Sequence, residues 1–196
     1  MTTYAFVDTE TTGLDRGAEV WEFAAIIRYS DDTEHTVHIH IDHNFEHAAT
    51  LDEKFRVDHD ARFGAATDMY VYTRAGAASI IHAALAGTHI VGVNPAFDAK
   101  MLERLLDVAD LQPSWHYRVI DLSAMTLGYR VAQRQDDGYE NLPVDIPWRS
   151  DDLAGQVMPM VTPEGEPMYP RHTALGDARW CRDWWDALTT LREEEY

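Results

Sequence analysis

Two carboxylates stand one residue apart near the start of the chain. Asp8 and Glu10 end a short apolar segment and are followed directly by Thr11, Thr12 and Gly13. Carboxylate oxygens are the ligands that Mg²⁺ and Mn²⁺ prefer, and a polar turn with free backbone N–H groups could receive a phosphate or a ribose. In so acidic a chain this spacing is expected about once by chance. Its position at the end of a predicted strand is therefore the stronger signal.

A further acidic residue, Asp98, closes the segment that begins at Asn94 and contains Phe97. A buried apolar stretch precedes this segment, and Pro95 is typical of a first helical position. Open α/β sheets bind their ligands at the carboxyl ends of the strands, and Asp98 is expected at that edge. An aspartate in a first helical turn can also serve the helix dipole alone.

The third candidate segment contains His172, which precedes Asp177 by five residues at the start of the last helix. Histidine titrates near neutral pH and can act as a general base. The same spacing occurs after His47 and His116, so the spacing decides nothing. His47 lies before the second segment, and His116 leaves too little chain after Asp98 for another helix and strand. The alternative for His172 is an exposed histidine without a role.

The hydrophobic pattern predicts how these segments are positioned. It indicates an α/β fold in which a mixed five-stranded sheet begins as a three-strand antiparallel meander and continues as βαβα units, with helices on both faces. We expect one domain over 1–196, interrupted by irregular insertions near 133–148 and 158–170 that are either a lid or plain surface insertions. The expected strands are 3–8, 20–28, 34–41, 88–93 and 117–120, and the expected helices are 75–86, 95–109, 121–131, a short one at 150–152, and 173–192.

The formal net charge is −18. Proteins that hold long stretches of nucleic acid usually present a basic face, so extended duplex binding is not expected. A substrate that is held at one terminus through divalent cations needs few basic contacts. The charge therefore favours an enzyme that processes ends over a protein that coats its substrate.

The remaining composition bears on location. The only cysteine, Cys181, excludes an internal disulfide and suits a reducing compartment. The first residues lack the pattern of a secretory signal, and no apolar run reaches about 18 residues. We expect a cytoplasmic protein with no membrane partner.

A histidine-rich strand is predicted at 34–41. His38 and His40 share one face of it and could form part of a metal site. The same alternation places Val37, Ile39 and Ile41 on the opposite face, as a half-exposed strand requires. We favour the plain strand at this point.

Taken in order, D-x-E-T-T-G, N-x-x-F-D and H-x-A-x-x-D resemble the DnaQ-like family of DEDDh 3′→5′ exonucleases, a ribonuclease H-like family that includes polymerase proofreading subunits and RNase T-type enzymes. The segments 20–26 and 119–122 look like its second and fifth strands. The stretch 155–171 is longer than is usual before the histidine, which leaves substrate preference open.

The resemblance implies a two-metal phosphodiester hydrolase that uses Mg²⁺ or Mn²⁺. Asp8 would bridge both ions, Glu10 and Asp177 would complete the first site, and Asp98 would act directly or through water. His172 would take the proton from the attacking water, and the product would be a 5′-mononucleotide. The residues that would meet the 3′-terminal nucleotide are Thr11, Leu14, Asn94 and Phe97.

Three functions remain open on these grounds. The first is an exonuclease acting on single-stranded DNA or frayed DNA ends, as in proofreading beside a DNA polymerase. The second is an RNA or oligoribonucleotide exonuclease with the same chemistry, because contact to a 2′-hydroxyl cannot be inferred from spacing. The third is a catalytically silent module that keeps the fold to bind a partner.

Overall fold

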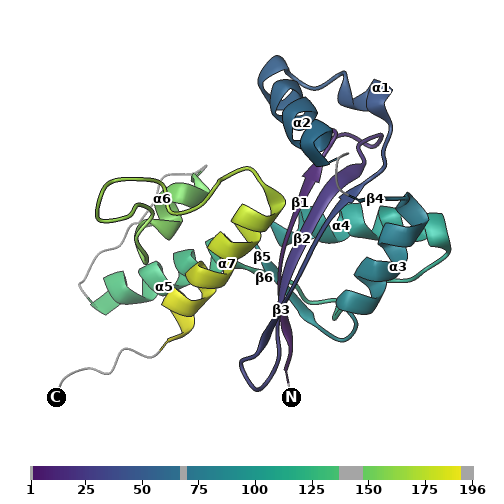
Figure 1. The fold of residues 1–196 in the computed structure, drawn as a ribbon. Coiled ribbons are helices and arrows are strands. Elements are labelled where there is room, and N and C mark those ends of the chain that lie inside the picture. Colours follow the sequence, from purple (N-terminus) through teal and green to yellow (C-terminus); the bar gives the residue numbers. More distant parts are fainter. Residues whose placement is uncertain (1, 67–69, 137–147, 191–196) are drawn as a thin grey trace.

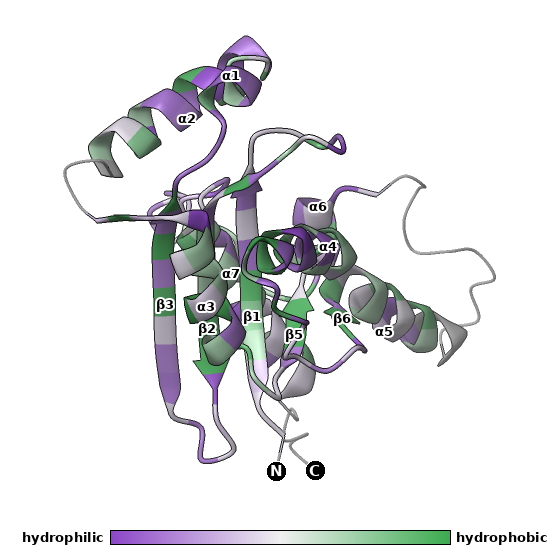
Figure 2. Ribbon diagram, turned by 90° about the vertical axis from the view of Figure 1, so that its right-hand side faces the viewer, coloured by the Kyte–Doolittle hydropathy of each residue, from purple (hydrophilic) through white to green (hydrophobic). Residues whose placement is uncertain are grey.

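The computed structural model describes residues 2–66, 70–136 and 148–190. Six strands form one sheet in the order β4-β3-β2-β1-β5-β6, and Figure 2 shows β3, β2, β1, β5 and β6 side by side. The strands are β1 (Tyr4–Thr11), β2 (Val20–Arg28), β3 (Glu34–Ile41), β4 (Val71–Tyr72), β5 (His89–Gly92) and β6 (Ile120–Asp121).

Helices cover both faces of the sheet. Figure 1 shows the sheet nearly edge-on, with α3 and α4 on one side, α5, α6 and α7 on the other, and α1 and α2 beyond one end of the long strands. The helices are α1 (Phe45–Ala48), α2 (Glu53–Ala66), α3 (Arg74–Ala84), α4 (Pro95–Leu106) with a 3₁₀ turn at Asp107–Ala109, α5 (Leu122–Asp136), α6 (Ser150–Ala154) and α7 (Ala174–Thr189).

The direction of the strands decides where ligands can bind. β1 pairs antiparallel with β2, and β2 antiparallel with β3, which gives the expected meander. β5 runs parallel to β1, and β6 parallel to β5. The carboxyl ends of β1, β5 and β6 therefore meet at one edge of the sheet.

The alternation of side chains along β1 divides the core into two layers. Ala5 and Val7 pack with α3 and α4 on one face. Phe6 points to the other face, where the buried rings of Trp180 and Trp184 on α7 lie. Asp8 and Glu10 continue the alternation of Phe6 and so emerge on the α7 side.

The predicted fold class is confirmed, and the bounds of the second and third strands agree with the prediction. A sixth strand, β4, adds two residues to the edge beside β3. Helix α5 continues to Asp136, so the first four residues of the predicted irregular stretch 133–148 are helical, and 137–147 lie outside the described residues.

The insertion at 158–170 forms a turn closed by one bridge between Val161 and Pro167. Both of its ends are anchored. The Tyr169 hydroxyl donates a hydrogen bond of 2.9 Å to Asp183 on α7, and Met158 is buried in the core layer of α7. These contacts fix the two ends of the insertion against the core layer of α7. Within the described part of the chain, no helix is long and apolar enough to cross a membrane.

Candidate active site

Three of the predicted carboxylates meet at the carboxyl end of β1. Asp8 and Glu10 project from the strand, and Asp177 comes from the first turn of α7, which packs along β1. One oxygen from each of the three lies within 4.8 Å of the others. We call Asp8, Glu10 and Asp177 the carboxylate cluster. Its donors are all oxygen, which is the set that Mg²⁺ and Mn²⁺ prefer.

Helix α7 begins where it does because Thr173 caps it. The Thr173 hydroxyl accepts a hydrogen bond of 3.1 Å from the N–H of Gly176, and its own proton goes to the Pro170 carbonyl at 2.7 Å. A Cβ on Gly176 would lie 2.5 Å from the Thr173 hydroxyl oxygen and 2.9 Å from Pro170 Cγ. The absence of a side chain at residue 176 thus lets the loop pack against the turn that carries Asp177.

Burial and mutual repulsion act on the cluster. Burial raises the pKa of Asp8 well above its usual range, and the neighbouring charges of Asp98, Asp177 and Glu10 raise it further. Burial also raises the pKa of Glu10 to about 8, although the Arg62 guanidinium opposes the shift. A divalent cation would relieve this repulsion, so the electrostatics fit a metal site.

Asp98 approaches the cluster from the other face of the sheet, in the first turn of α4, and is not one of the three mutually close carboxylates. The pairing of β1 with β5 ends at Phe6 and Val91. Beyond that point Asp98 Oδ1 accepts hydrogen bonds from the Thr9 N–H at 3.0 Å and the Thr9 hydroxyl at 2.7 Å. Burial raises the pKa of Asp98 to about 6 although these hydrogen bonds oppose it. Asp98 is therefore fixed beside Asp8 through Thr9.

A positive charge lies against the cluster. The Arg171 guanidinium forms ion pairs with Asp177 and, at 2.9 Å, with Asp151, and its central carbon lies 3.4 Å from the ring centroid of Trp180. Burial raises the pKa of Asp177, and Arg171 is the largest influence in the opposite direction. Arg171 thus partly neutralises the carboxylate that α7 supplies.

His172 lies beside Asp177 of the cluster. Its backbone is in the left-handed region with φ of 62°, and its N–H donates a hydrogen bond of 3.1 Å to Asp177 Oδ2. The residue is exposed. The backbone contact ties the position of the histidine to a carboxylate of the cluster and leaves the side chain open to solvent.

The four residues predicted to meet the substrate divide into two groups. Leu14, 86% exposed, and the half-buried Phe97 line one groove of about 570 Å³ together with Lys100, Met101 and Arg104. The other two do not line it. The Thr11 hydroxyl donates a hydrogen bond of 2.8 Å to the Gly13 carbonyl, and Asn94 is an exposed residue with φ of 55° before α4.

Three residues of this region were not among the predicted site residues: Thr9, Arg62 and Arg171. Thr9 stands between two predicted ligands, but nothing in its type predicts a hydrogen bond to Asp98. Arg62 comes from α2, a helix that was not expected. Arg171 directly precedes His172, and that adjacency was the only available signal.

Comparison with known proteins identifies the fold. No family model and no curated protein matches the chain. Among solved structures, E. coli exonuclease I in complex with a dA16 oligonucleotide matches with a TM-score of 0.61 and 17% identity over 98% of this chain and 41% of that one. Its complex with a dT13 oligonucleotide matches with a TM-score of 0.57 and 16% identity over 95% and 41%.

A third match, the ExoI/SSB-Ct complex, has a TM-score of 0.58 and 14% identity over 96% of this chain and 41% of the other. The chain spans about two fifths of the length of these structures. At such low identity the likeness shows the fold, which is the ribonuclease H-like α/β fold.

Proposed function

We propose that the protein is a metal-dependent 3′→5′ exonuclease of the DEDDh type that releases 5′-mononucleotides. The observation that carries the proposal is the meeting of Asp8, Glu10 and Asp177 at the carboxyl end of β1, with Asp98 fixed beside them. The fold shared with exonuclease I supports a nuclease, although fold alone does not determine activity.

The chemistry follows from the donor set. Asp8, Glu10, Asp98 and Asp177 would hold two Mg²⁺ or Mn²⁺ ions, which when bound neutralise charge on the scissile phosphate and on the leaving 3′-oxygen. His172 is the general base of the proposal, and it would accept the proton of the attacking water. Its exposed position and its backbone bond to Asp177 support that role, because the base must reach water beside the carboxylates.

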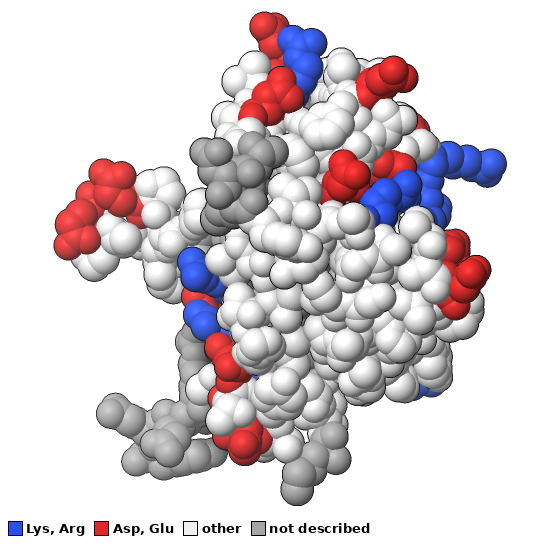
Figure 3. All heavy atoms as spheres, turned by 45° about the vertical axis from the view of Figure 1, so that its right-hand side comes forward, with Lys and Arg blue, Asp and Glu red and all other residues white. Residues whose placement is uncertain are grey.

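A single-stranded DNA end is the proposed substrate. The groove that Leu14 and Phe97 line also contains basic Arg16, Lys100 and Arg104 and one acidic residue, Asp15. Apolar side chains with an excess of basic ones suit a stacked base and its phosphates. On the face drawn in Figure 3, acidic side chains form several separate groups and basic side chains fewer. Such a surface suits a short terminal segment of substrate better than a long duplex.

The test is a cleavage assay with Mg²⁺ on 5′-labelled single-stranded DNA. We expect a ladder that shortens from the 3′ end, with loss in EDTA. Asp8→Asn should abolish it, and His172→Gln should slow it by about 10²–10⁴-fold. Glu164→Gln and His35→Gln replace an exposed carboxylate and an exposed histidine outside the cluster and should leave the rate unchanged.

Strands of equal length in DNA and RNA, run side by side, decide the substrate. Faster turnover of RNA would replace DNA with RNA in the proposal and leave the chemistry intact. Turnover of neither strand, or undiminished turnover in Asp8→Asn, would contradict the exonuclease and favour a binding module.

A further inference from the structure

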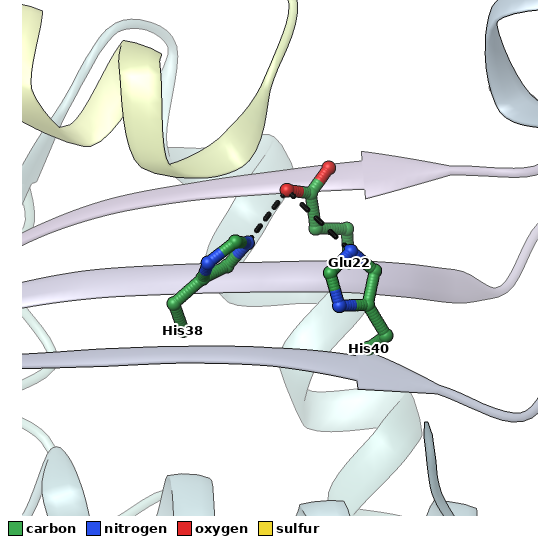
Figure 4. A group of neighbouring side chains, drawn as sticks. All are labelled: Glu22, His38 and His40. Carbon is green, nitrogen blue, oxygen red and sulfur yellow. Dashed lines mark hydrogen bonds and ion pairs between the residues drawn. The ribbon is translucent and has the colours of Figure 1, made fainter. Parts of the chain in front are cut away.

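A second group of possible metal ligands lies on β2 and β3, next to the strand that carries Asp8 and Glu10. Glu22 on β2 faces His38 and His40 on β3, and one ligand atom of each lies within 4.8 Å of the others. The Nε2 atoms of His38 and His40 lie 2.8 Å and 4.0 Å from the same oxygen, Glu22 Oε1. Figure 4 shows the two rings and the carboxylate pointing toward one another.

The register of the sheet produces this arrangement. His40 is the direct partner of Glu22 across β2 and β3, and His38 is the partner of Ala24. Ala24 belongs to the core layer under α7, so the three ligand residues lie on that face of the sheet. Cross-strand neighbours on one face have Cβ atoms about 5 Å apart, which is close enough for their ends to converge on one ion.

The distances fit a borderline divalent ion. Zinc bonds of about 2.0–2.1 Å to nitrogen and oxygen place tetrahedral ligands about 3.3 Å apart. The two nitrogen-to-oxygen distances of 2.8 Å and 4.0 Å bracket that value. Two imidazoles and one carboxylate are also the ligand types of a three-residue zinc site with an open fourth position.

The three side chains differ in burial, as a metal site requires if its ligands are held in place and an ion can still reach them. The Glu22 side chain is 4% exposed and that of His40 is 11%, whereas that of His38 is 32%. Glu22 and His40 are therefore held in fixed positions. The more exposed His38 leaves a path by which an ion can enter, and space for the open coordination position of that ion.

The second carboxylate oxygen of Glu22, Oε2, already has an ion-pair partner. Arg62 of α2 forms an ion pair with Glu22 Oε2, and it contacts Glu10 at 3.7 Å and Asp58 at 2.6 Å. This contact orients the carboxylate so that Oε1 faces the histidines, as an outer partner of a ligand does.

The local charge still favours a cation. Three carboxylates, those of Glu10, Glu22 and Asp58, surround the single guanidinium of Arg62. The Glu10 and Glu22 residues are direct partners across β1 and β2. An ion at the histidines would therefore enter a region of excess negative charge.

We propose that Glu22, His38 and His40 form a second metal site, selective for ions that favour imidazole such as Zn²⁺, Co²⁺ or Ni²⁺, and distinct from the carboxylate cluster. The site ties β2 to β3 and does not depend on the proposed exonuclease activity. A hydrogen-bonded Glu22–His38 pair that binds no ion is the competing explanation.

The first experiment measures binding to the whole protein after chelator stripping. Zn²⁺ is titrated calorimetrically in excess Mg²⁺, which competes at oxygen donors and poorly at imidazoles. We expect one zinc ion per chain. Nitrogen NMR of the histidine rings should show that zinc shifts the Nε2 signals of His38 and His40 in the unaltered protein, a result that needs no variant to fold.

Variants then assign the ligands. His38→Gln and His40→Gln should each weaken zinc binding by at least about 10–100-fold, and both should lose the rise in melting temperature that zinc gives the unaltered protein. His35→Gln, an exposed residue of the same strand, and Asp8→Asn in the cluster should keep it.

Two results would overturn the proposal. One is unchanged zinc affinity in the double variant of His38 and His40 with no NMR shift at either ring. The other is loss of binding in Asp8→Asn or in His59→Gln instead, since His59 Nε2 lies 2.9 Å from His43 Nε2 and could attract zinc elsewhere. Because none of these measurements uses cleavage, they stand apart from the test of the exonuclease.

Discussion

Replacing Glu10 by Gln tests whether the carboxylate cluster destabilises the metal-free protein. Burial raises the pKa of Glu10 from 4.5 to about 8. A folded-state pKa above the unfolded value means that the folded state holds the proton more tightly, so stability falls as the pH rises from about 4.5 to about 8. Glu10→Gln removes this titration and should be the more stable protein at pH 7.

The magnitude follows from the width of the pH window. Each pH unit between 4.5 and 7 costs about 1.4 kcal/mol, which gives at most about 3 kcal/mol at pH 7. The Glu10 side chain is 22% exposed, so solvent screens part of this cost. We therefore expect Glu10→Gln to raise the free energy of unfolding by about 1–2 kcal/mol at pH 7 and by nearly nothing at pH 4.5.

The assay is urea unfolding of both proteins in EDTA at the two pH values. Glu103→Gln, an exposed glutamate of α4, serves as the matched control and should show no pH-dependent gain. Mg²⁺ should stabilise the unaltered protein more than Glu10→Gln. A variant that is equally stable or less stable than the unaltered protein at pH 7 would refute the reasoning.

Three further changes test the neighbours of the cluster. Gly176→Ala should lower the free energy of unfolding by about 2 kcal/mol or more, because the added Cβ has no room. Gly128→Ala is the control: no atom lies near its added Cβ, so it should raise the free energy of unfolding by about 0.5–1 kcal/mol. Denaturant titration of both variants checks the two values. Thr9→Val removes the hydroxyl bond to Asp98 and should weaken Mg²⁺ binding by about 1–2 kcal/mol in calorimetry; unchanged affinity would contradict that positioning. Arg171→Met removes the cation at the cluster and should tighten Mg²⁺ binding severalfold, and weaker binding would show that the arginine assists the ion.

The sequence predicted β3 from the alternation of its residue types, and the predicted bounds agree with the structure. Its burial does not alternate as strictly, because His40 is buried between Ile39 and Ile41. Helix α2 was missed because only His59 and Phe63 of its described side chains are buried, which leaves almost no apolar stripe to detect. Figure 2 accordingly shows hydrophilic and hydrophobic residues mixed along α2.

The carboxylates of the candidate site could be predicted because their residue types alone indicate metal ligands. Asp8, Glu10 and Asp177 have types and positions that indicate ligands, and the structure brings them together. Glu22 was not predictable as a neighbour of His38 and His40, because their contact depends on the register of β2 against β3. Register places Glu22 opposite His40, and no spacing within one strand contains that information.

The hydrogen bonds between Thr9 and Asp98 also link the carboxylates of β1 to the helix that lines the groove. Asp98 lies in the first turn of α4, and the same helix supplies Phe97, Lys100 and Arg104 to the groove. Thr9 lies between the two carboxylates of β1, so these bonds of 2.7 Å and 3.0 Å hold α4, with the groove side chains that it carries, in a fixed position relative to Asp8 and Glu10. A change at Thr9 is therefore expected to disturb the groove as well as the carboxylates.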